Sequence, residues 1–370
     1  MATPYGKIDW SRQVYQSSAG GVTYCPADRG GRLVTKSTPR LAKLLQEDYV
    51  DLPARRVVKR FADHHHVSYS KDLVLDLHAH LSEHLKEVED RWTYQTAPVA
   101  VLQRVATVSI SRDGAMAHML DGKASSPAAA AAAARAAGWR ECMCGVICLY
   151  DDEQECLHTT YVGVGPQADK PAFTYQLSRE VARLKQELQA AGVEPTYVGV
   201  ADGAVSNWTQ LEALTDRQVT DYFHVSERLG KVATTLKGGK AQQQAWLGAQ
   251  KSRLLEQAAG ADLVIASVEE LLDTEQIKST AKRSVVRENL TYLRNQRLRM
   301  NYYELRQAKL PIGSGPVEAG CKTLIKARLG GSGMRWLIAG ADDMLISRSQ
   351  VLTDGRYDQY WQKRMQYAAN

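Results

Sequence analysis

Residues 196–203 read TYVGVADG, a short apolar run that ends in an aspartate and a glycine. The run before Asp202 predicts a strand that is buried on both faces. Residues 173–191, just before it, carry apolar side chains at helical spacing and end at Gly192, which predicts a helix. Because a helix that leads into a buried strand indicates a parallel crossover, we predict an α/β fold with Asp202 at the edge of the sheet where ligands bind.

Other segments of the chain also favour strands. Residues 106–111 alternate as a half-buried strand that ends in Arg112-Asp113-Gly114, so that Asp113 also follows a strand. Residues 142–150 form a near-continuous apolar run, and residues 157–164 follow an acidic turn. Residues 219–223 are interpreted as one more strand of the same sheet.

The composition is that of an ordinary globular protein. The 370 residues allow two or three domains, and the net charge of +6 favours polyanionic partners. No apolar run reaches the roughly 18 residues of a spanning helix, and no signal-peptide core follows the N-terminus, so we expect a cytoplasmic protein without a membrane partner. The six cysteines lack paired CxxC spacing, which argues against a disulfide framework or a zinc ribbon.

The N-terminal quarter predicts a short arm followed by helices. Residues 1–37 are polar and punctuated by glycines, which is typical of an arm with little core. Three helices are predicted between Thr38 and about Arg91, and their tight turns suit a helix-turn-helix-like DNA-binding module over residues 38–95. A small helical bundle without DNA contacts is the alternative. The candidate DNA contacts on the polar faces are Arg40, Lys43, Arg55, Arg56, Lys59 and Arg60.

Residues 226–309 are helical in composition, and we expect an all-α domain there. Between Lys278 and Lys309 nine basic residues stand against two acidic ones, with tyrosines interleaved, a pattern that suits phosphate contact and base stacking but also a solvated helix face. Trp246 either stacks on an unpaired base or packs in the core. The alanine-rich residues 124–137 predict a further helix. Candidate DNA contacts in this half of the chain are Lys282, Arg283, Arg294, Arg297, Lys322 and Arg335.

A third carboxylate follows a cap-like sequence. Residues 312–318 read IGSGPVE, in which the serine or glycine can cap a helix and the proline can occupy its first position, so that Glu318 projects from the first turn. If Asp113 and Asp202 lie near Glu318, the three charges repel one another and a divalent cation relieves the repulsion. Each Asp-Gly pair is also a common turn, which is the alternative for either aspartate.

Several stretches together carry a family resemblance. On these stretches, which extend over nearly the whole chain, the sequence resembles bacterial insertion-sequence transposases of the ISKra type, a branch of the DDE recombinases related to eukaryotic Mutator-like elements. In chain order the stretches are VYQSS (14–18) with Cys25-Pro26, STPR (37–40), SRDG (111–114), GWRE (138–141), YVGVADGA (197–204), DYFH (221–224), LPIGSGPVEA (310–319) and GMRW (333–336). The last two of these stretches are the most specific.

The resemblance implies an RNase H-like core in residues 100–225 and 310–370, interrupted by the helical insertion at 226–309. It implies that Asp113, Asp202 and Glu318 are ligands of Mg²⁺, for which Mn²⁺ substitutes. Asp221 and His224 match the (C/D)xxH motif of the Mutator-like group. His224 is then either a catalytic polar group near the scissile phosphate or a hydrogen-bonded histidine at the end of a strand.

The activity implied by the resemblance is DNA transposition. Such a protein binds terminal inverted repeats of double-stranded DNA through residues 38–95, cleaves the phosphodiester with two metal ions and directs the freed 3′ hydroxyl at target DNA. Pairing of two DNA ends predicts a homodimer or a higher oligomer, associated with the nucleoid. Two alternatives stay open: a structure-selective RNase H-like nuclease, and a catalytically inactive, transposase-derived DNA-binding protein. Arg112, the alanine tract and Gly320 favour an inactive copy.

Overall fold

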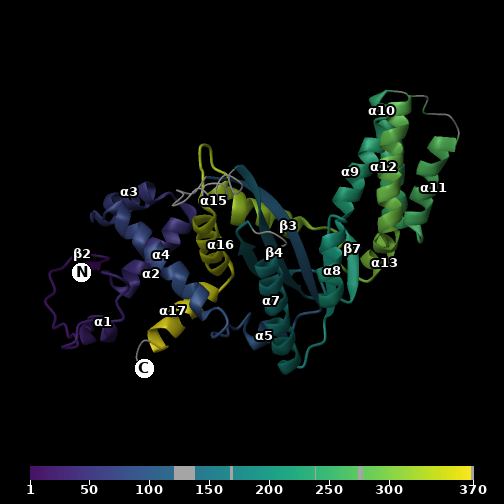
Figure 1. The fold of residues 1–370 in the computed structure, drawn as a ribbon. Helices are drawn as coiled ribbons and strands as arrows, with labels where there is room; N and C mark the ends of the chain where they lie inside the picture. Colours follow the sequence, from purple (N-terminus) through teal and green to yellow (C-terminus); the bar gives the residue numbers. More distant parts are fainter. Residues whose placement is uncertain (121–137, 167–169, 238, 274–276, 278, 368–370) are drawn as a thin grey trace.

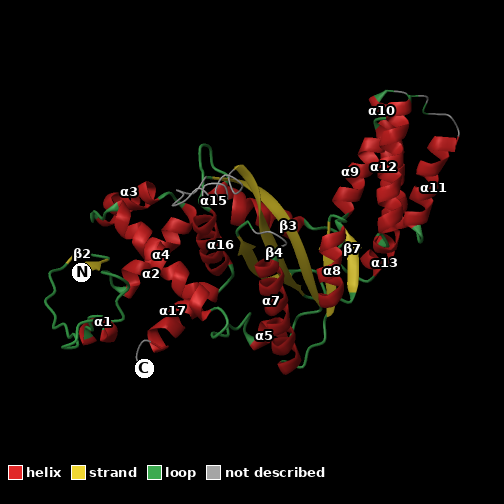
Figure 2. Ribbon diagram, viewed as in Figure 1, coloured by secondary structure: helices red, strands yellow, loops and turns green. Residues whose placement is uncertain are grey.

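The computed structural model describes residues 1–120, 138–166, 170–237, 239–273, 277 and 279–367. A mixed five-stranded sheet lies at its centre, with helices on both faces, so the predicted α/β class is confirmed (Figure 2). The strand order is β5-β4-β3-β6-β7. The strands are β3 (Thr107–Met119), β4 (Gly138–Tyr150), β5 (Cys156–Val164), β6 (Thr196–Ala201) and β7 (Arg217–Thr220).

The sheet combines an antiparallel half with a parallel half. Strands β3, β4 and β5 pair antiparallel in succession, whereas β6 pairs parallel with both β3 and β7. Helix α7 (Pro171–Ala190) connects β5 to β6, and α8 (Val205–Leu214) connects β6 to β7. The predicted parallel crossover into the strand before Asp202 is therefore confirmed.

The prediction that a strand ends at Asp113 is wrong. Strand β3 continues to Met119 because β4 pairs with it along its whole length, and Asp113 lies opposite Cys144 in mid-strand. Gly114, for which the alternative given above was a turn, is a strand residue. A Cβ atom there would lie 2.2 Å from Oε1 of Glu141, so the glycine makes room for that side chain.

The prediction of a strand over residues 219–223 is wrong in its second half. Strand β7 ends at Thr220, and Asp221 caps helix α9 (Tyr222–Ala233) by accepting a hydrogen bond from the backbone N–H of Phe223. The carboxylate satisfies an N–H group that no intrahelical carbonyl can reach. His224 consequently lies in the first turn of a helix and not at a strand end.

Two separate cores cover the two faces of the sheet. On one face, α7 and α8 pack with the short helix α5 (Val99–Leu102) against Ile110 and Ile147. On the other face, Leu324 and Met344 pack against Cys144 and Val146. The elements on this second face are α14 (Gly315–Gly320), the π-helical turn η2 (Cys321–Lys326), α15 (Ala327–Leu329) and α16 (Ile338–Leu352).

The three helices predicted near the N-terminus are present. Thr38 caps the first through the N–H of Leu41, and Ser70 caps the third through the N–H of Leu73. These helices share the second core with α16 and lie beside the C-terminal helix α17 (Arg356–Tyr367) (Figure 1). The N-terminal elements are β1 (Ala2–Thr3), β2 (Gly6–Lys7), α1 (Pro26–Gly30), α2 (Pro39–Asp51), α3 (Ala54–His65) and α4 (Lys71–Val88).

The predicted helical segment forms a bundle with its own core, which extends from the β7 side of the sheet, away from the N-terminal helices (Figure 1). Trp246 is partly buried and packs against that core. After α9 the bundle contains α10 (Lys240–Glu256), α11 (Gly260–Asp273), α12 (Thr280–Gln296), the 3₁₀ turn η1 (Arg297–Arg299) and α13 (Tyr302–Gln307). The helix predicted over 124–137 lies outside the described residues, and the domain boundaries stay predictions.

Among the helices of the described residues, none combines the length and the apolar character needed to cross a membrane.

Candidate active site

The aligned ends of β6 and β7 bring two aspartates to one edge of the sheet. Ala201 lies beside Thr220 in the parallel ladder, and each is the last residue of its strand. Asp202 and Asp221 follow directly, and the backbone N–H of Asp221 donates to the carbonyl oxygen of Ala201 at 2.8 Å. The sequence thus predicted correctly that Asp202 ends a strand at this edge.

Asp221 and His224 form a hydrogen-bonded pair. The carboxylate of Asp221 is fully buried, and its Oδ2 accepts from Nδ1 of His224 at 2.8 Å and from Oγ of Ser314 at 2.6 Å. Burial raises the pKa of Asp221, but these hydrogen bonds outweigh burial and the pKa lies below its ordinary value. The hydrogen bond to Asp221 raises the pKa of His224 to about 9. With Nδ1 held in this way, Nε2 is the ring nitrogen left for a ligand.

Glu318 lies next to this pair. One ligand atom each of Asp221, His224 and Glu318 lies within 4.8 Å of the others. In the part of the chain that the structure describes, this is the group of three acidic, histidine or cysteine residues with the spacing of a metal site. It includes two of the predicted site residues, Glu318 and His224, but it contains neither Asp113 nor Asp202.

Asp113 is half-buried on β3, on the face that carries α14. Its Oδ1 accepts from the backbone N–H of Gly114 at 2.7 Å, and Sγ of Cys321 lies 3.8 Å from Oδ2. Burial raises the pKa of Asp113, the negative charge of Asp202 raises it further, and the charge of His224 opposes the increase. Asp113 therefore interacts electrostatically with Asp202 and with His224. It does not belong to the tight cluster of ligand atoms that Asp221, His224 and Glu318 form.

The loop that carries Asp202 is held by the helical bundle. Oδ1 of Asp202 accepts from Nδ2 of Asn207 at 2.9 Å, within the same loop and helix. From α12, the hydroxyl of Tyr292 donates to the carbonyl oxygen of Asp202 at 2.7 Å, and Nε2 of Gln296 donates to that of Gly203 at 2.9 Å. The bundle thus helps to fix the position of this carboxylate.

Sequence reasoning missed most of these supporting residues. Ser314 stands inside the IGSGPVE stretch, where it was interpreted only as a possible helix cap, and the structure instead directs its hydroxyl to Asp221. Tyr292 was noticed only as one of several tyrosines among basic residues. No local signal links Tyr292 or Gln296 to Asp202, because about 90 residues separate them in the chain.

The basic residues predicted to contact DNA fall into two groups. Arg40, Arg55, Arg56, Lys322 and Arg335 are exposed. The others interact within the chain: Lys43 with Asp358, Lys59 with Asp63, Arg60 with Asp48, Arg294 with Glu269, Arg297 with Asp262, Lys282 with the carbonyl of Thr235, and Arg283 with the carbonyls of Leu272 and Ile277. Exposed ion pairs contribute little stability, so a phosphate can replace such a carboxylate at small cost. DNA contact by these residues stays a prediction.

The donor set of the site is rich in oxygen. Four carboxylates and one imidazole come from β3, the loop after β6, the start of α9, and α14. Carboxylate oxygens are the ligands that Mg²⁺ and Mn²⁺ prefer. The residues therefore suit a hard divalent cation.

Comparisons with known proteins add little to this geometry. No family model and no curated protein matches the sequence. Among solved structures, the chain is similar to the Drosophila P element transposase strand transfer complex, with 9% sequence identity and a TM-score of 0.41, over 86% of this chain and 93% of that one. At this TM-score the likeness supports no conclusion about activity.

Proposed function

We propose that the protein is a DDE-type DNA transposase in which Asp113, Asp202 and Glu318 hold Mg²⁺ or Mn²⁺. The observation that carries the proposal is the convergence of acidic groups around His224. A carboxylate oxygen of Glu318 lies within 4.8 Å of a ring nitrogen of His224. The charge of Asp202 raises the pKa of His224, and the charge of His224 lowers the pKa of Asp113. Carboxylates that the fold brings together from distant parts of the chain repel one another, so their convergence favours a cation as the shared partner.

The topology of the sheet supports an RNase H-like core. Three antiparallel strands, β3, β4 and β5, are followed by two strands that lie parallel to β3 on its other side. This is the strand order of that fold, and the helical bundle enters the chain between Asp202 and Glu318, as the family resemblance implies. The fold class and the position of the carboxylates are thus mutually consistent.

The residues around the proposed cations have distinct roles. A divalent cation, when bound, activates the attacking oxygen and neutralises charge on the scissile phosphate. His224, protonated because Asp221 raises its pKa to about 9, places a positive charge beside the same phosphate. Asp221 is a positioning residue, since its carboxylate is buried and occupied by three donors.

We further propose that α2–α4 recognise the terminal inverted repeats. Arg40, Arg55 and Arg56 are exposed on these helices and provide contacts to phosphate. Because two DNA ends are joined in one reaction, a homodimer or a higher oligomer forms on DNA.

The test is cleavage and strand transfer on DNA that carries the sequences flanking the gene, with Mg²⁺ or Mn²⁺ present. We expect Asp202→Asn and Glu318→Gln to abolish both reactions while DNA binding stays within about twofold of wild type, because these carboxylates act on the reacting phosphate. Asp273→Asn, at an exposed site at the end of α11, is the matched control and should retain activity.

Three outcomes contradict the proposal. Wild-type activity in either carboxylate variant would rule out the three-carboxylate mechanism. Tight binding of the ends without any cleavage by the wild-type protein would instead identify an inactive, DNA-binding copy. Cleavage of branched or nicked DNA without preference for the flanking sequences would identify a structure-selective nuclease.

A further inference from the structure

A large apolar ring lies exposed at the rim of the carboxylate site. Phe223 stands between Asp221 and His224 in the chain, and 60% of its surface is exposed. Its backbone N–H is bound by Asp221, so the position of its main chain is fixed by the site itself. Its ring meets that of Tyr222 at 71°, with centroids 5.8 Å apart, and Tyr222 in turn packs against the buried Tyr302.

One face of the Phe223 ring packs against residues 312–314, which precede Glu318. A Cβ atom built on Gly313 would lie 3.2 Å from Cε2 and 3.4 Å from Cδ2 of Phe223, so the ring covers the bare backbone of that glycine. Ser314 is bonded to Asp221, and the N–H of Tyr222 donates to the carbonyl of Ile312 at 2.9 Å. The segment and the start of α9 are therefore locked together, and Phe223 is held in place on one side while it faces solvent on the other.

A second exposed apolar side chain follows the neighbouring strand. Val205 begins α8, three residues after Asp202, and is 81% exposed. Because β6 and β7 end side by side, Val205 and Phe223 each follow one of the two aspartates at the same edge of the sheet. Exposed apolar side chains thus follow both strand ends that carry the aspartates.

We propose that Phe223 stacks on an unpaired DNA base next to the phosphate held at the carboxylate site. This inference rests on the proposed function, since it assumes that the substrate is DNA. Phosphates have charged partners in this site, whereas an aromatic ring is complementary to the face of a base. The base is unpaired because a base inside a duplex already has both faces stacked. Trp246 does not take this role, because it packs against the core of the bundle.

The test is a thermodynamic cycle between the ring and the base. A labelled duplex of the sequence flanking the gene is nicked at its boundary, an abasic site is placed at each nearby position in turn, and binding is measured in Ca²⁺. At one position we expect the abasic site to weaken wild-type binding by roughly 5- to 100-fold. Phe223→Ala should weaken binding of the nicked duplex that carries every base by the same factor. Its binding should not weaken further when the abasic site is placed at that position.

Three variants separate stacking from a purely structural role of the ring. Phe223→Trp should retain the dependence on the base. Gly313→Ala keeps the ring but forces it to shift, so it should lose part of the dependence while its unfolding midpoint stays near that of wild type. Leu298→Ala, at an exposed apolar residue of η1, should behave as wild type.

Independent effects of the ring and of the base at every position would overturn the inference and leave the proposed function intact. A wild-type protein that does not bind the flanking DNA at all would overturn both. Loss of base dependence in Phe223→Trp would also contradict stacking, because a larger aromatic face should preserve it.

Discussion

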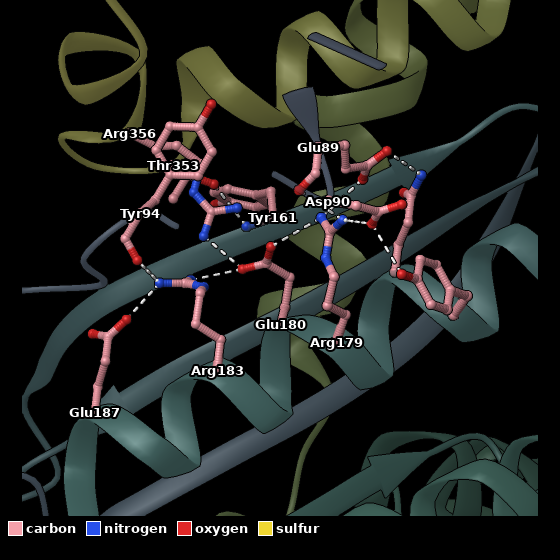
Figure 3. Close-up of polar contacts among 12 residues, drawn as sticks. Glu89, Asp90, Tyr94, Tyr161, Arg179, Glu180, Arg183, Glu187, Thr353 and Arg356 are labelled. Atoms are coloured by element: carbon pink, nitrogen blue, oxygen red, sulfur yellow. Dashed lines mark hydrogen bonds and ion pairs between the residues drawn. The ribbon is translucent and has the colours of Figure 1, made fainter. Parts of the chain in front are cut away.

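A buried ion-pair network joins the helix beneath the sheet to the C-terminal helix, and its removal should destabilise the protein strongly. Glu180 on α7 is 6% exposed, and its Oε2 accepts from Arg356 at 2.5 Å and from Arg183 at 2.7 Å (Figure 3). Arg356, at the start of α17, is itself 6% exposed. Arg179 extends the network to Glu89 in the segment that follows α4. We predict that Glu180→Gln breaks the ion pair between α7 and α17, whereas the contact of Arg179 with Glu89 remains.

The size of the effect follows from the burial of the charges that remain. Removing one partner of a buried ion pair leaves an uncompensated charge and costs about 3–5 kcal/mol. Because domains unfold with a free energy of about 5–15 kcal/mol, this is a large share of the total. Burial alone raises the pKa of Glu180, but the charges and hydrogen bonds of Arg356 and Arg183 outweigh burial and hold that pKa well below its usual range.

The sign of the pH dependence follows from that low pKa. Glu180 binds a proton more readily in the unfolded chain, so its contribution to stability is complete above its ordinary pKa of 4.5 and is lost as the pH falls toward the lower folded-state value. The difference in stability between wild type and Glu180→Gln should therefore be constant near neutral pH and shrink below pH 4.5.

Urea unfolding followed by near-ultraviolet circular dichroism measures this difference. The matched control is Glu194→Gln, an exposed glutamate in the loop after α7, which should unfold like wild type. A loss below about 1 kcal/mol for Glu180→Gln at pH 7, with an unchanged denaturant slope, would refute the reasoning, because so small a cost is that of an exposed pair.

Two further predictions concern histidines. Burial lowers the pKa of His78 to about 4, so the unfolded chain binds a proton more readily, and the free energy of unfolding should fall by up to about 3 kcal/mol between pH 6.5 and pH 4. His78→Leu should flatten this part of the curve of urea midpoint against pH. An unchanged curve would contradict the assignment. Asp221→Asn removes the hydrogen bond and the charge that raise the pKa of His224 most, while the burial that lowers it remains, so an NMR titration without divalent cations should find the pKa falling from about 9. A value still near 9 would show that another group holds the proton.

The sequence predicted elements whose pattern is local and misplaced those whose ends depend on pairing. Strand β6 and Asp202 were placed correctly because an apolar run and its terminating aspartate are adjacent in the chain. Asp113 was misplaced because the length of β3 is determined by β4, which starts 25 positions later at Gly138. An Asp-Gly pair is common in turns, and here the missing Cβ of the glycine leaves space for the side chain of Glu141 within the strand pairing.

The candidate site was only partly predictable for a similar reason. Glu318 and His224 were named from motifs, and the structure brings both together. The role of Asp221 as the group that orients His224 depends on a helix cap that was interpreted as a strand. Tyr292 and Gln296 contact the Asp202 loop from α12, about 90 residues further along the chain, and periodicity cannot indicate such long-range contacts.

Arg112 was interpreted as a sign of an inactive copy because of its place beside Asp113. Neighbouring residues of a strand point to opposite faces, and Arg112 lies 5% exposed on the face away from Asp113. Its guanidinium donates to Oε1 of Gln210 and lies over the ring of Phe173, 5.0 Å from the centroid. Arg112 therefore contributes to packing beneath the site and leaves the face of Asp113 unobstructed.

Gly320 was the other residue that favoured an inactive copy, because glycine weakens the helix that carries Glu318. A Cβ atom at this position would lie 2.8 Å from Cγ2 of Val146 and 2.9 Å from Sγ of Cys144, both in β4. With any larger residue at this position, α14 or these two side chains would have to shift. The glycine thus costs some helix stability but permits the close approach on which the carboxylate site depends, so neither residue argues against an active enzyme.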